Sequence, residues 1–239
     1  MNCAIMQPTF NPWIGYFDLI DYVDKFILFD TVQLNQQSWQ TRNKIKAQNK
    51  ESLISIPIIK SKSKNELLIK DALIDFRKYD FRKKLLKTIE QNYTKSKYYN
   101  EVHSFIKELI LYDTNYLSCY NTNIIKKICK KLKINTEIDV LSETEYVSNV
   151  KKGEQVLDIC QYYKIYEYIS PIGSKAYLDN VSDDFKSQKI IIQYQNYNHP
   201  SYTQLGDSFI PYIGIFDLLY NEGFDNSIKI IKSGRSFIK

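Results

Sequence analysis

The stretch Met1-Asn-Cys-Ala-Ile-Met-Gln-Pro-Thr-Phe-Asn-Pro-Trp-Ile-Gly-Tyr-Phe-Asp18 decides the fold of this chain. It predicts a short apolar strand at 2–6 that runs directly into a loop with two prolines, a tryptophan and two amides. A helix expected at 14–23 and an apolar strand at 25–30 complete a strand–loop–helix–strand unit. In a parallel sheet this unit places the loop at the carboxyl edge, where open α/β folds bind ligands. The opening sequence therefore predicts a pocket as well as a core.

Strands and helices alternate along the rest of the chain. Two further elements form a hairpin, at 40–47 and 52–58, with its turn at 48–51. Apolar residues with helical spacing predict a helical middle section, with helices at 79–93, 99–111 and 116–132. Later strands are expected at 136–142, 166–170 and 189–194, and later helices at 153–163 and 209–220, the last one ending at Asn221-Glu-Gly223. The fold class is therefore α/β, an open and largely parallel sheet flanked by helices.

Size and composition are those of one globular domain over 1–239, with a helical subdomain at about 78–134. The 239 residues are 44% hydrophobic and 25% charged, and no Gly/Pro-rich linker divides them. The net charge of +6 is compatible with nucleic acid, an anionic membrane surface or a phosphorylated small substrate as partner. Basic residues are scattered among acids and no nucleic-acid motif occurs, so no specific nucleic acid is expected. No apolar run approaches the length of a membrane span.

The cysteines and the missing motifs restrict the chemistry. No CxxC pair occurs and no signal peptide begins the chain, which predicts four reduced, packed thiols in the cytoplasm, at Cys3, Cys119, Cys129 and Cys160. Two histidines and scattered cysteines make a zinc site improbable, so no metal and no tightly bound cofactor is expected. There is also no G-x-S-x-G, no P-loop and no complete G-x-G-x-x-G.

The first candidate site surrounds the first two strands. Amides, an indole and carboxylates lie in the loop, in the following helix and just after the second strand, at Gln7, Asn11, Trp13, Asp18, Asp30 and Gln33. The carboxyl ends of parallel strands meet at one edge, so most of these side chains are expected to converge there. The alternative is a scaffold role, in which Asn11-Pro12 forms a turn and Asp18 is an exposed helix residue.

The second candidate site is Gln36-Gln-Ser-Trp-Gln-Thr-Arg-Asn-Lys44. Arg42 offers a planar fork of donors that suits a phosphate or a carboxylate, and Trp39 could stack on a ring. Asn43, which lies between Arg42 and Lys44 in the sequence, adds an amide. The alternative is a surface hairpin whose cations face water.

A third group lies near the carboxyl terminus. His199 is in the loop Tyr197-Asn-His-Pro-Ser-Tyr-Thr-Gln204 and could act as an acid or base near neutral pH. Asp217 lies among apolar residues and, if buried, needs a partner such as Arg or His. Asn221 lies four residues later on the same helical face. A structural salt bridge and catalysis are equally compatible with Asp217, and the basic tail at 232–236 is expected to fray.

Together these blocks resemble the WbqC-like family of bacterial surface-polysaccharide gene clusters. The matching blocks are Ala4-Ile-Met-Gln-Pro, Pro12-Trp-Ile-Gly-Tyr-Phe-Asp18, Phe29-Asp30, Val32-Gln33, Ser38-Trp-Gln-Thr-Arg-Asn-Lys-Ile-Lys46, Ile89-Glu-Gln-Asn-Tyr93, Tyr168-Ile-Ser170, Gly173, Tyr177-Leu178, His199-Pro-Ser-Tyr-Thr-Gln204, Phe209-Ile-Pro211 and Asp217-Leu-Leu-Tyr-Asn-Glu-Gly223. They span nearly the whole chain in order. The family often has His where this chain has Met6, and another His near Leu85. If either is catalytic in relatives, this chain works differently or has lost activity.

The resemblance implies a cytoplasmic role in making a modified sugar for O-antigen or a similar glycan. On that basis we expect a transferase that forms an amide by moving an acyl or aminoacyl group to a nucleotide-linked amino sugar, with the activated donor as co-substrate and a homodimer as one possible assembly. His199 and Asp217 are the catalytic candidates. The substrate-binding set is Gln7, Asn11, Trp13, Asp30, Gln33, Trp39, Arg42, Asn43, Tyr202, Gln204 and Asn221. The alternatives are a nucleotidyl or adenylyl transferase and a non-catalytic nucleotide-sugar binding protein.

Overall fold

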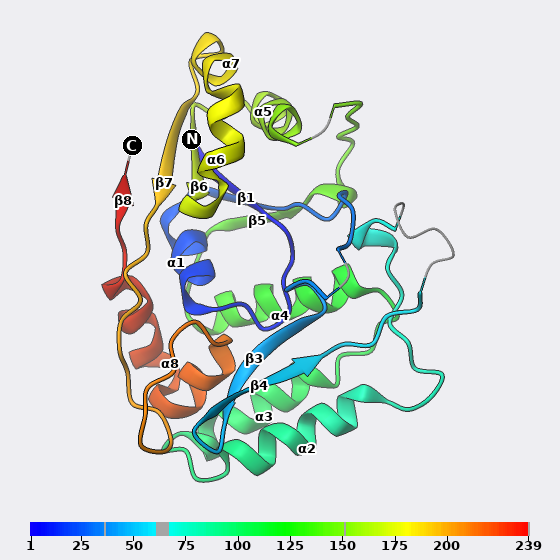
Figure 1. Ribbon diagram of the computed structural model, residues 1–239, viewed down its shortest axis with the longest axis vertical. Helices are drawn as coiled ribbons and strands as arrows, with labels where there is room; N and C mark the ends of the chain where they lie inside the picture. Colours follow the sequence, from blue (N-terminus) through cyan, green and yellow to red (C-terminus); the bar gives the residue numbers. More distant parts are fainter. Residues whose placement is uncertain (36, 61–66, 151, 239) are drawn as a thin grey trace.

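A six-stranded sheet organises the fold in the computed structural model, which describes residues 1–35, 37–60, 67–150 and 152–238 (Figure 1). The strand order is β5-β2-β1-β6-β7-β8. Five strands are mutually parallel, namely β1 (Asn2–Met6), β2 (Lys25–Leu28), β5 (Glu137–Val140), β6 (Glu167–Pro171) and β7 (Ile191–Gln195). The short β8 (Phe237–Ile238) pairs antiparallel with β7. The predicted α/β class with an open, largely parallel sheet is therefore confirmed.

Alternate residues of β1 enter two separate apolar clusters, one on each face of the sheet. Ala4 packs with the cluster that contains α1 (Ile14–Tyr22), whereas Cys3 and Ile5 pack with the cluster that contains α5 (Gly153–Tyr162). A strand that is buried on both faces needs an uninterrupted apolar run, and this explains the sequence Cys3-Ala-Ile5. Short helices α6 (Lys175–Leu178) and α7 (Ser182–Ser187) also lie on the α5 side.

The helical middle section consists of α2 (Phe81–Tyr93), α3 (Tyr99–Ile110) and α4 (Leu117–Lys131). Their buried faces belong to the same apolar cluster as α1 and β1. Each begins and ends within two residues of its predicted bounds, because the apolar spacing was unbroken in all three. Single-turn 3₁₀ helices occupy Ile69–Asp71, Leu141–Glu143, Ile172–Ser174 and Asp179–Val181.

The predicted hairpin forms a separate two-stranded ribbon of β3 (Arg42–Ala47) and β4 (Lys50–Ser55). Its turn contains only Gln48 and Asn49, both with positive φ (48° and 62°), and is therefore shorter than the predicted turn. Two residues with positive φ match the twist of the flanking strands, so β4 starts at Lys50. Arg42, Lys44 and Lys46 then share one face of β3.

The last helix begins later than predicted. Helix α8 spans Ile215–Ser233, whereas the sequence predicted 209–220 with an end at Gly223. Gly223 has the non-helical angles φ 68° and ψ −179°, so the first helical stretch ends at the predicted glycine and a second stretch follows the kink. A Cβ at this position would lie 2.7 Å from the ring of Tyr98, so the glycine allows the ring to pack against the kink.

The basic tail is fixed, not frayed as expected. Arg235 donates from Nε to Asp18 (2.7 Å) and from Nη2 to Asp21 (2.6 Å), and β8 follows it. Asp18 is fully buried and also accepts a hydrogen bond from Gln195 Nε2 (2.9 Å). The alternative of an exposed Asp18 is therefore wrong, because this carboxylate joins α1 to β7 and to the end of the chain.

The four cysteines are free thiols. Three of them are buried as expected, but Cys119 is exposed on α4, because it lies on the side of the helix that does not face the core.

In the described parts of the chain, every helix is too short or too polar to cross a bilayer.

Asp30 connects three elements at the carboxyl edge of the sheet. It follows β2 and is 1% exposed. One carboxylate oxygen accepts from the hydroxyls of Ser118 on α4 and Ser142 after β5, both at 2.7 Å, and the other accepts from the Ser142 amide at 3.1 Å. Charged acceptors make stronger hydrogen bonds than neutral ones, so this carboxylate stabilises the edge.

We predict that Asp30→Ala lowers the free energy of unfolding by about 2–4 kcal/mol, because three donors at the edge lose their acceptor. Urea denaturation followed by circular dichroism measures this change. Glu145→Ala, at an exposed position in the loop before α5, serves as the control and should stay within about 0.5 kcal/mol of the wild type. Equal stability of the Asp30 and Glu145 variants would contradict the proposed role of the carboxylate.

Candidate functional site

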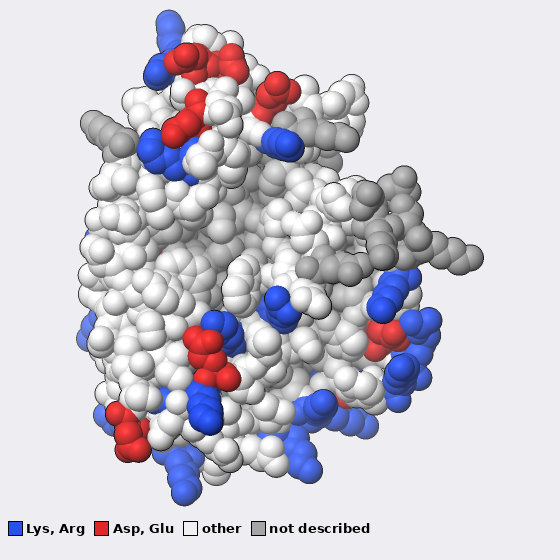
Figure 2. All heavy atoms as spheres, in the orientation of Figure 1, with Lys and Arg blue, Asp and Glu red and all other residues white. Residues whose placement is uncertain are grey.

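The loops that follow β1 and β6 flank the point where the order of the strands reverses. From β1 the chain winds outward to β2 and β5 on one side, whereas β6 and β7 lie on the other. Open α/β sheets bind ligands in the crevice at such a point. Figure 2 shows the visible face hollowed between the α6 segment and the β3–β4 ribbon, with lysine or arginine side chains over the ribbon. We call this region the central hollow.

Side-chain amides hold the loop after β1 against the segment before β3. Gln7 is partly exposed, and its side-chain oxygen accepts a hydrogen bond from the buried Gln40. Asn121 on α4 donates to the carbonyls of Pro8 (3.0 Å) and Gln40 (2.9 Å). Gln40 lies in the second candidate stretch but had no predicted role, and Asn121 was not predicted, because an amide in a polar loop and one in a helix carry no recognisable spacing. The hydrogen bonds of Gln40 and Asn121 position Gln7 at the carboxyl edge of the sheet.

Asn11 and Asn43 both act inside the protein. Asn11 has φ 45° and is fully buried, and its Oδ1 accepts from the Phe216 amide (3.1 Å) in the first turn of α8. Asn43 Nδ2 donates to the carbonyls of Phe10 (2.9 Å) and Asn11 (2.8 Å). These contacts agree with the turn interpretation of Asn11-Pro12, and substrate contact by either asparagine stays a prediction.

Trp39, Arg42 and Gln33 are predicted residues whose side chains reach solvent. Trp39 is 51% exposed, while its carbonyl accepts from the Phe10 amide (2.9 Å) and so ties it to the first loop. Arg42 is partly exposed, and its hydrogen bond to Gln37 is long, at 3.5 Å. Gln33 is exposed in the loop after β2. Gln36, within the second candidate stretch, lies outside the described residues.

Lys44 ends the second candidate stretch but was not among the predicted substrate-binding residues. It lies two residues after Arg42 on the same face of β3, so the two cations are roughly 7 Å apart along the strand. Its Nζ pairs with Glu51 on β4 at 2.6 Å, and both side chains are partly exposed. The alternation of cations in Arg42-Asn-Lys44 was the signal that could have identified it.

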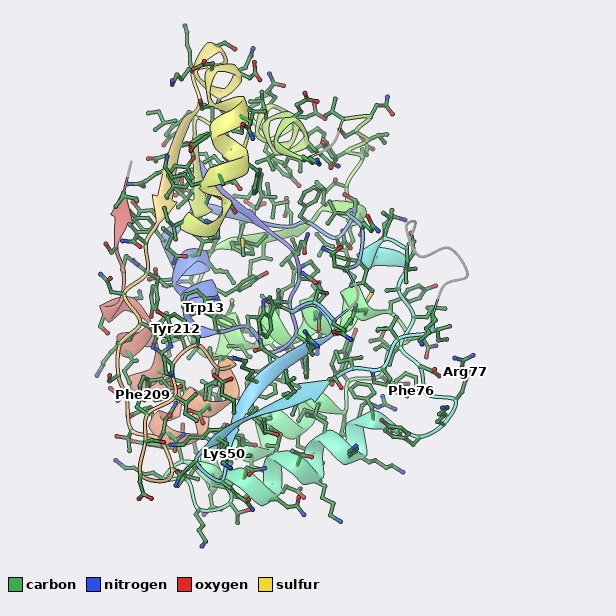
Figure 3. The ribbon with its side chains drawn as sticks, viewed as in Figure 1. Trp13, Lys50, Phe76, Arg77, Phe209 and Tyr212 are labelled. Carbon is green, nitrogen blue, oxygen red and sulfur yellow. The ribbon has the colours of Figure 1, made fainter. Side chains whose placement is uncertain are left out.

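His199 is part of an aromatic cluster beside the central hollow. The Trp13 ring is stacked near it (6.1 Å between centroids, 13° between planes), and Tyr212 meets it edge-on (4.8 Å). Both ring nitrogens have partners: Nε2 accepts from the Tyr212 amide (3.2 Å), so the neutral ring donates from Nδ1 to the Pro200 carbonyl (2.9 Å). Burial lowers the pKa of His199, which keeps the ring neutral near pH 7. Figure 3 labels Trp13 and Tyr212 close together on this face.

Asp217 lies in a buried network with tyrosines, not with the Arg or His that the sequence suggested. Its two oxygens accept from the hydroxyls of Tyr93 (2.9 Å) and Tyr202 (3.0 Å). Burial raises the pKa of Asp217 to about 6, and the two phenols and the charge of Lys46 oppose that rise. Arg235, the expected type of partner, pairs with Asp18 instead.

Gln204 and Asn221 support this network. The side chain of Gln204 makes hydrogen bonds with both the amide (2.8 Å) and the carbonyl (3.0 Å) of Ile210, and its nitrogen also donates to the Tyr202 hydroxyl (3.2 Å). Asn221 donates to the carbonyl of Asp217, one helical turn earlier (2.8 Å). Both amides therefore have partners inside the protein, and their contact with a substrate stays a prediction.

The predicted residues thus form two groups. Gln7 and Trp39 are tied to each other's segments at the loop after β1, with Arg42 at the start of β3, and the indole of Trp13 is partly exposed beside Tyr212. Asp217 is fully buried and does not line the hollow. Among the described residues, no group of three or more His, Cys, Asp or Glu is placed to hold a metal ion.

A second groove, of about 560 Å³, lies away from the sheet edge between α3, α4 and α8. Lys131 lies over the rings of Phe105 (5.9 Å) and Phe224 (4.7 Å), and Lys127 pairs with Glu108. Lysines at the end of α4 also oppose the negative end of the helix dipole. Charges of both signs line this groove and it lies away from the reversal of strand order, so we place the candidate site at the central hollow.

The raised pKa of Asp217 predicts a pH dependence of stability. Folding favours the protonated form, so its stabilising contribution is present at low pH and is lost as pH rises from its usual pKa of 3.8 to about 6. Asp217→Asn cannot titrate. The free energy of unfolding of the wild type minus that of the variant should therefore fall by up to about 3 kcal/mol across this window. Chemical denaturation at a series of pH values measures it, with the exposed Asp184→Asn as control. Parallel pH curves for wild type and Asp217→Asn would refute the prediction.

Comparisons with known proteins agree with the resemblance described above. The model of the WbqC-like protein family matches residues 7–229. The chain is 32% identical over 223 residues to the uncharacterized protein Rv1507c of Mycobacterium tuberculosis, and the match covers 92% of this chain and 93% of that protein. No solved structure matches. The family match begins at Gln7 and includes the first loop, β3 and the aromatic cluster, and on this evidence the chain belongs to the WbqC-like protein family.

Proposed function

We propose that the protein is a transferase of surface-glycan biosynthesis that moves an acyl or aminoacyl group onto the amine of a nucleotide-linked amino sugar. The observation that carries this proposal is the exposed Trp39, which is tied by its carbonyl to the loop after β1, with Arg42 three residues later at the start of β3. An exposed indole suits a base or sugar ring. A partly exposed guanidinium whose side-chain partner among the described residues is 3.5 Å away suits a diphosphate. Lys44 adds a second cation on the same face.

The reaction needs few groups from the protein. The amine nitrogen attacks the acyl carbonyl carbon, the C–N bond forms, and the bond to the donor's leaving group breaks with its electron pair. The proton lost by the nitrogen passes to a base or to water. Holding an amine next to an activated acyl group supplies much of the acceleration by positioning alone. A sparse set of acid–base residues is therefore compatible with this chemistry.

Two observations favour a second candidate, a nucleotide-sugar binding protein without catalysis. Both ring nitrogens of His199 are hydrogen-bonded within the protein, and so are both carboxylate oxygens of Asp217. His199 must give up its contact with the Tyr212 amide before Nε2 can accept a proton, and Asp217 is fully buried, away from a substrate in the hollow. Binding of nucleotide-linked amino sugars with no turnover on any acyl donor would favour this candidate over the transferase.

We predict that Arg42→Ala weakens binding of UDP-glucosamine, a nucleotide-linked amino sugar, by about 10- to 100-fold, because a charge-assisted contact with the diphosphate is lost. Isothermal titration calorimetry measures the Kd. The matched control is Arg77→Ala. Arg77 is exposed, pairs with Asp75 and lies at the right edge of the molecule in Figure 3. Mass spectrometry after incubation with acyl-coenzyme A and aminoacyl donors tests turnover.

The outcomes separate the two candidates. A mass gain equal to the acyl group supports the transferase. Binding without a mass gain supports the binding protein. Equal Kd values for the Arg42 and Arg77 variants, or no binding of any nucleotide-linked sugar, would remove the support for both.

A further inference from the structure

Tyr212 has a backbone conformation that its residue type disfavours. Its φ is 58°, in the left-handed region, where a bulky aromatic residue is an outlier. The side chain is 58% exposed, so burial of the ring does not compensate for the conformation. Strained residues of this kind persist where the surrounding structure holds them, and they occur often at ligand sites.

His199 holds Tyr212 in this conformation. Nε2 of the imidazole accepts the Tyr212 amide hydrogen at 3.2 Å, and the Pro200 carbonyl fixes the tautomer by accepting from Nδ1 at 2.9 Å. The same imidazole is packed against the phenol ring of Tyr212 and lies nearly parallel to Trp13. One side chain therefore sets both the backbone and the ring of Tyr212.

Trp13 and Tyr212 form an aromatic corner at the side of the central hollow. Their ring centroids are 5.5 Å apart and the planes are inclined by 53°. A planar base that inserts between two rings needs them parallel and about 7 Å apart, twice the usual contact distance. This pair is too close and too inclined for such an insertion. A pyranose ring can instead lie on the exposed ring of Tyr212 and touch the edge of the partly exposed Trp13 indole beside it.

We propose that Trp13 and Tyr212 form the sugar subsite, which contacts the pyranose ring of the nucleotide-linked sugar, and that His199 is a positioning residue for Tyr212. This inference rests on the proposed function, because it takes the nucleotide end of the ligand to lie at Trp39 and Arg42. It gives His199 a role that uses the hydrogen bonds it already makes. Figure 3 labels the two aromatic residues next to each other, to the left of the β3–β4 ribbon in this view.

The two tryptophans of the chain allow each end of the ligand to be followed separately. In Trp39→Phe, the remaining fluorescence reports the aromatic corner, and in Trp13→Phe it reports the nucleotide end. UDP should change the emission of Trp39 alone, whereas UDP-glucosamine should change both. A response of Trp39 to UDP-glucosamine with no response of Trp13 would overturn the sugar subsite and leave the proposed function intact.

Substitution of Tyr212 tests the contact itself. Tyr212→Ala should raise the Kd of UDP-glucosamine by about 5- to 30-fold, the usual effect of losing one stacking ring, and should leave the Kd of UDP unchanged. His199→Ala should weaken UDP-glucosamine binding similarly, and the double variant should be no weaker than either single one. Additive losses, or equal losses for UDP, would overturn the positioning role. Absence of binding by both ligands in the wild type would instead overturn the proposed function.

A third variant separates strain from contact. Glycine accepts a positive φ without cost, so Tyr212→Gly should have a melting temperature about 2–4 °C above that of Tyr212→Ala while binding the sugar nucleotide equally weakly. Equal melting temperatures for the two variants would show that the backbone at 212 is unstrained and would overturn that part of the inference.

Discussion

The site depends on one constraint, the need to satisfy the backbone of a loop that has no secondary structure. Residues 7–12 leave β1 and cross the carboxyl edge outside any strand, and Trp13 makes one isolated bridge with Gly214. Buried carbonyls cost free energy unless they find a donor. Asn43 and Asn121 supply those donors to Phe10, Asn11 and Pro8. Amide side chains from two other elements thus take the place of a neighbouring strand, and the positions of Gln7 and Trp13 follow from them.

The parallel sheet and its helices could be predicted from the sequence because both signals are local. Uninterrupted apolar runs at the first strands and helical spacing through 79–132 specify elements that are buried in the usual way. The start of α8 was missed for a physical reason. The Asn11 side chain, about two hundred residues earlier, accepts a hydrogen bond from the Phe216 amide in the first turn of α8. The sequence near residue 215 gives no indication of this distant partner.

The site was harder to predict than the fold, since the same residue types serve as ligands and as scaffold. Asp30, Asp18 and Asp217 all lie next to predicted edges or helices, and each is satisfied by groups inside the protein. Their partners come from distant segments, so sequence spacing cannot separate the two roles. Trp39 and Arg42 differ from them only in their exposure, which appears once the ribbon is folded. The positive φ of Tyr212 could not be predicted from the sequence, because the position holds neither glycine nor asparagine, the residue types that usually adopt it.

The contact between Asn11 and the amide of Phe216 also determines when this protein can finish folding. A ribosome releases the amino terminus first, yet the loop after β1 receives its last hydrogen bonds from a helix that begins at Ile215. A contact of such long sequence separation forms slowly. Gly214 fits the same junction closely, since a Cβ there would lie 2.0 Å from the Asn11 side chain. During synthesis the nascent chain therefore carries an incomplete crevice until the residues that begin α8 have been translated.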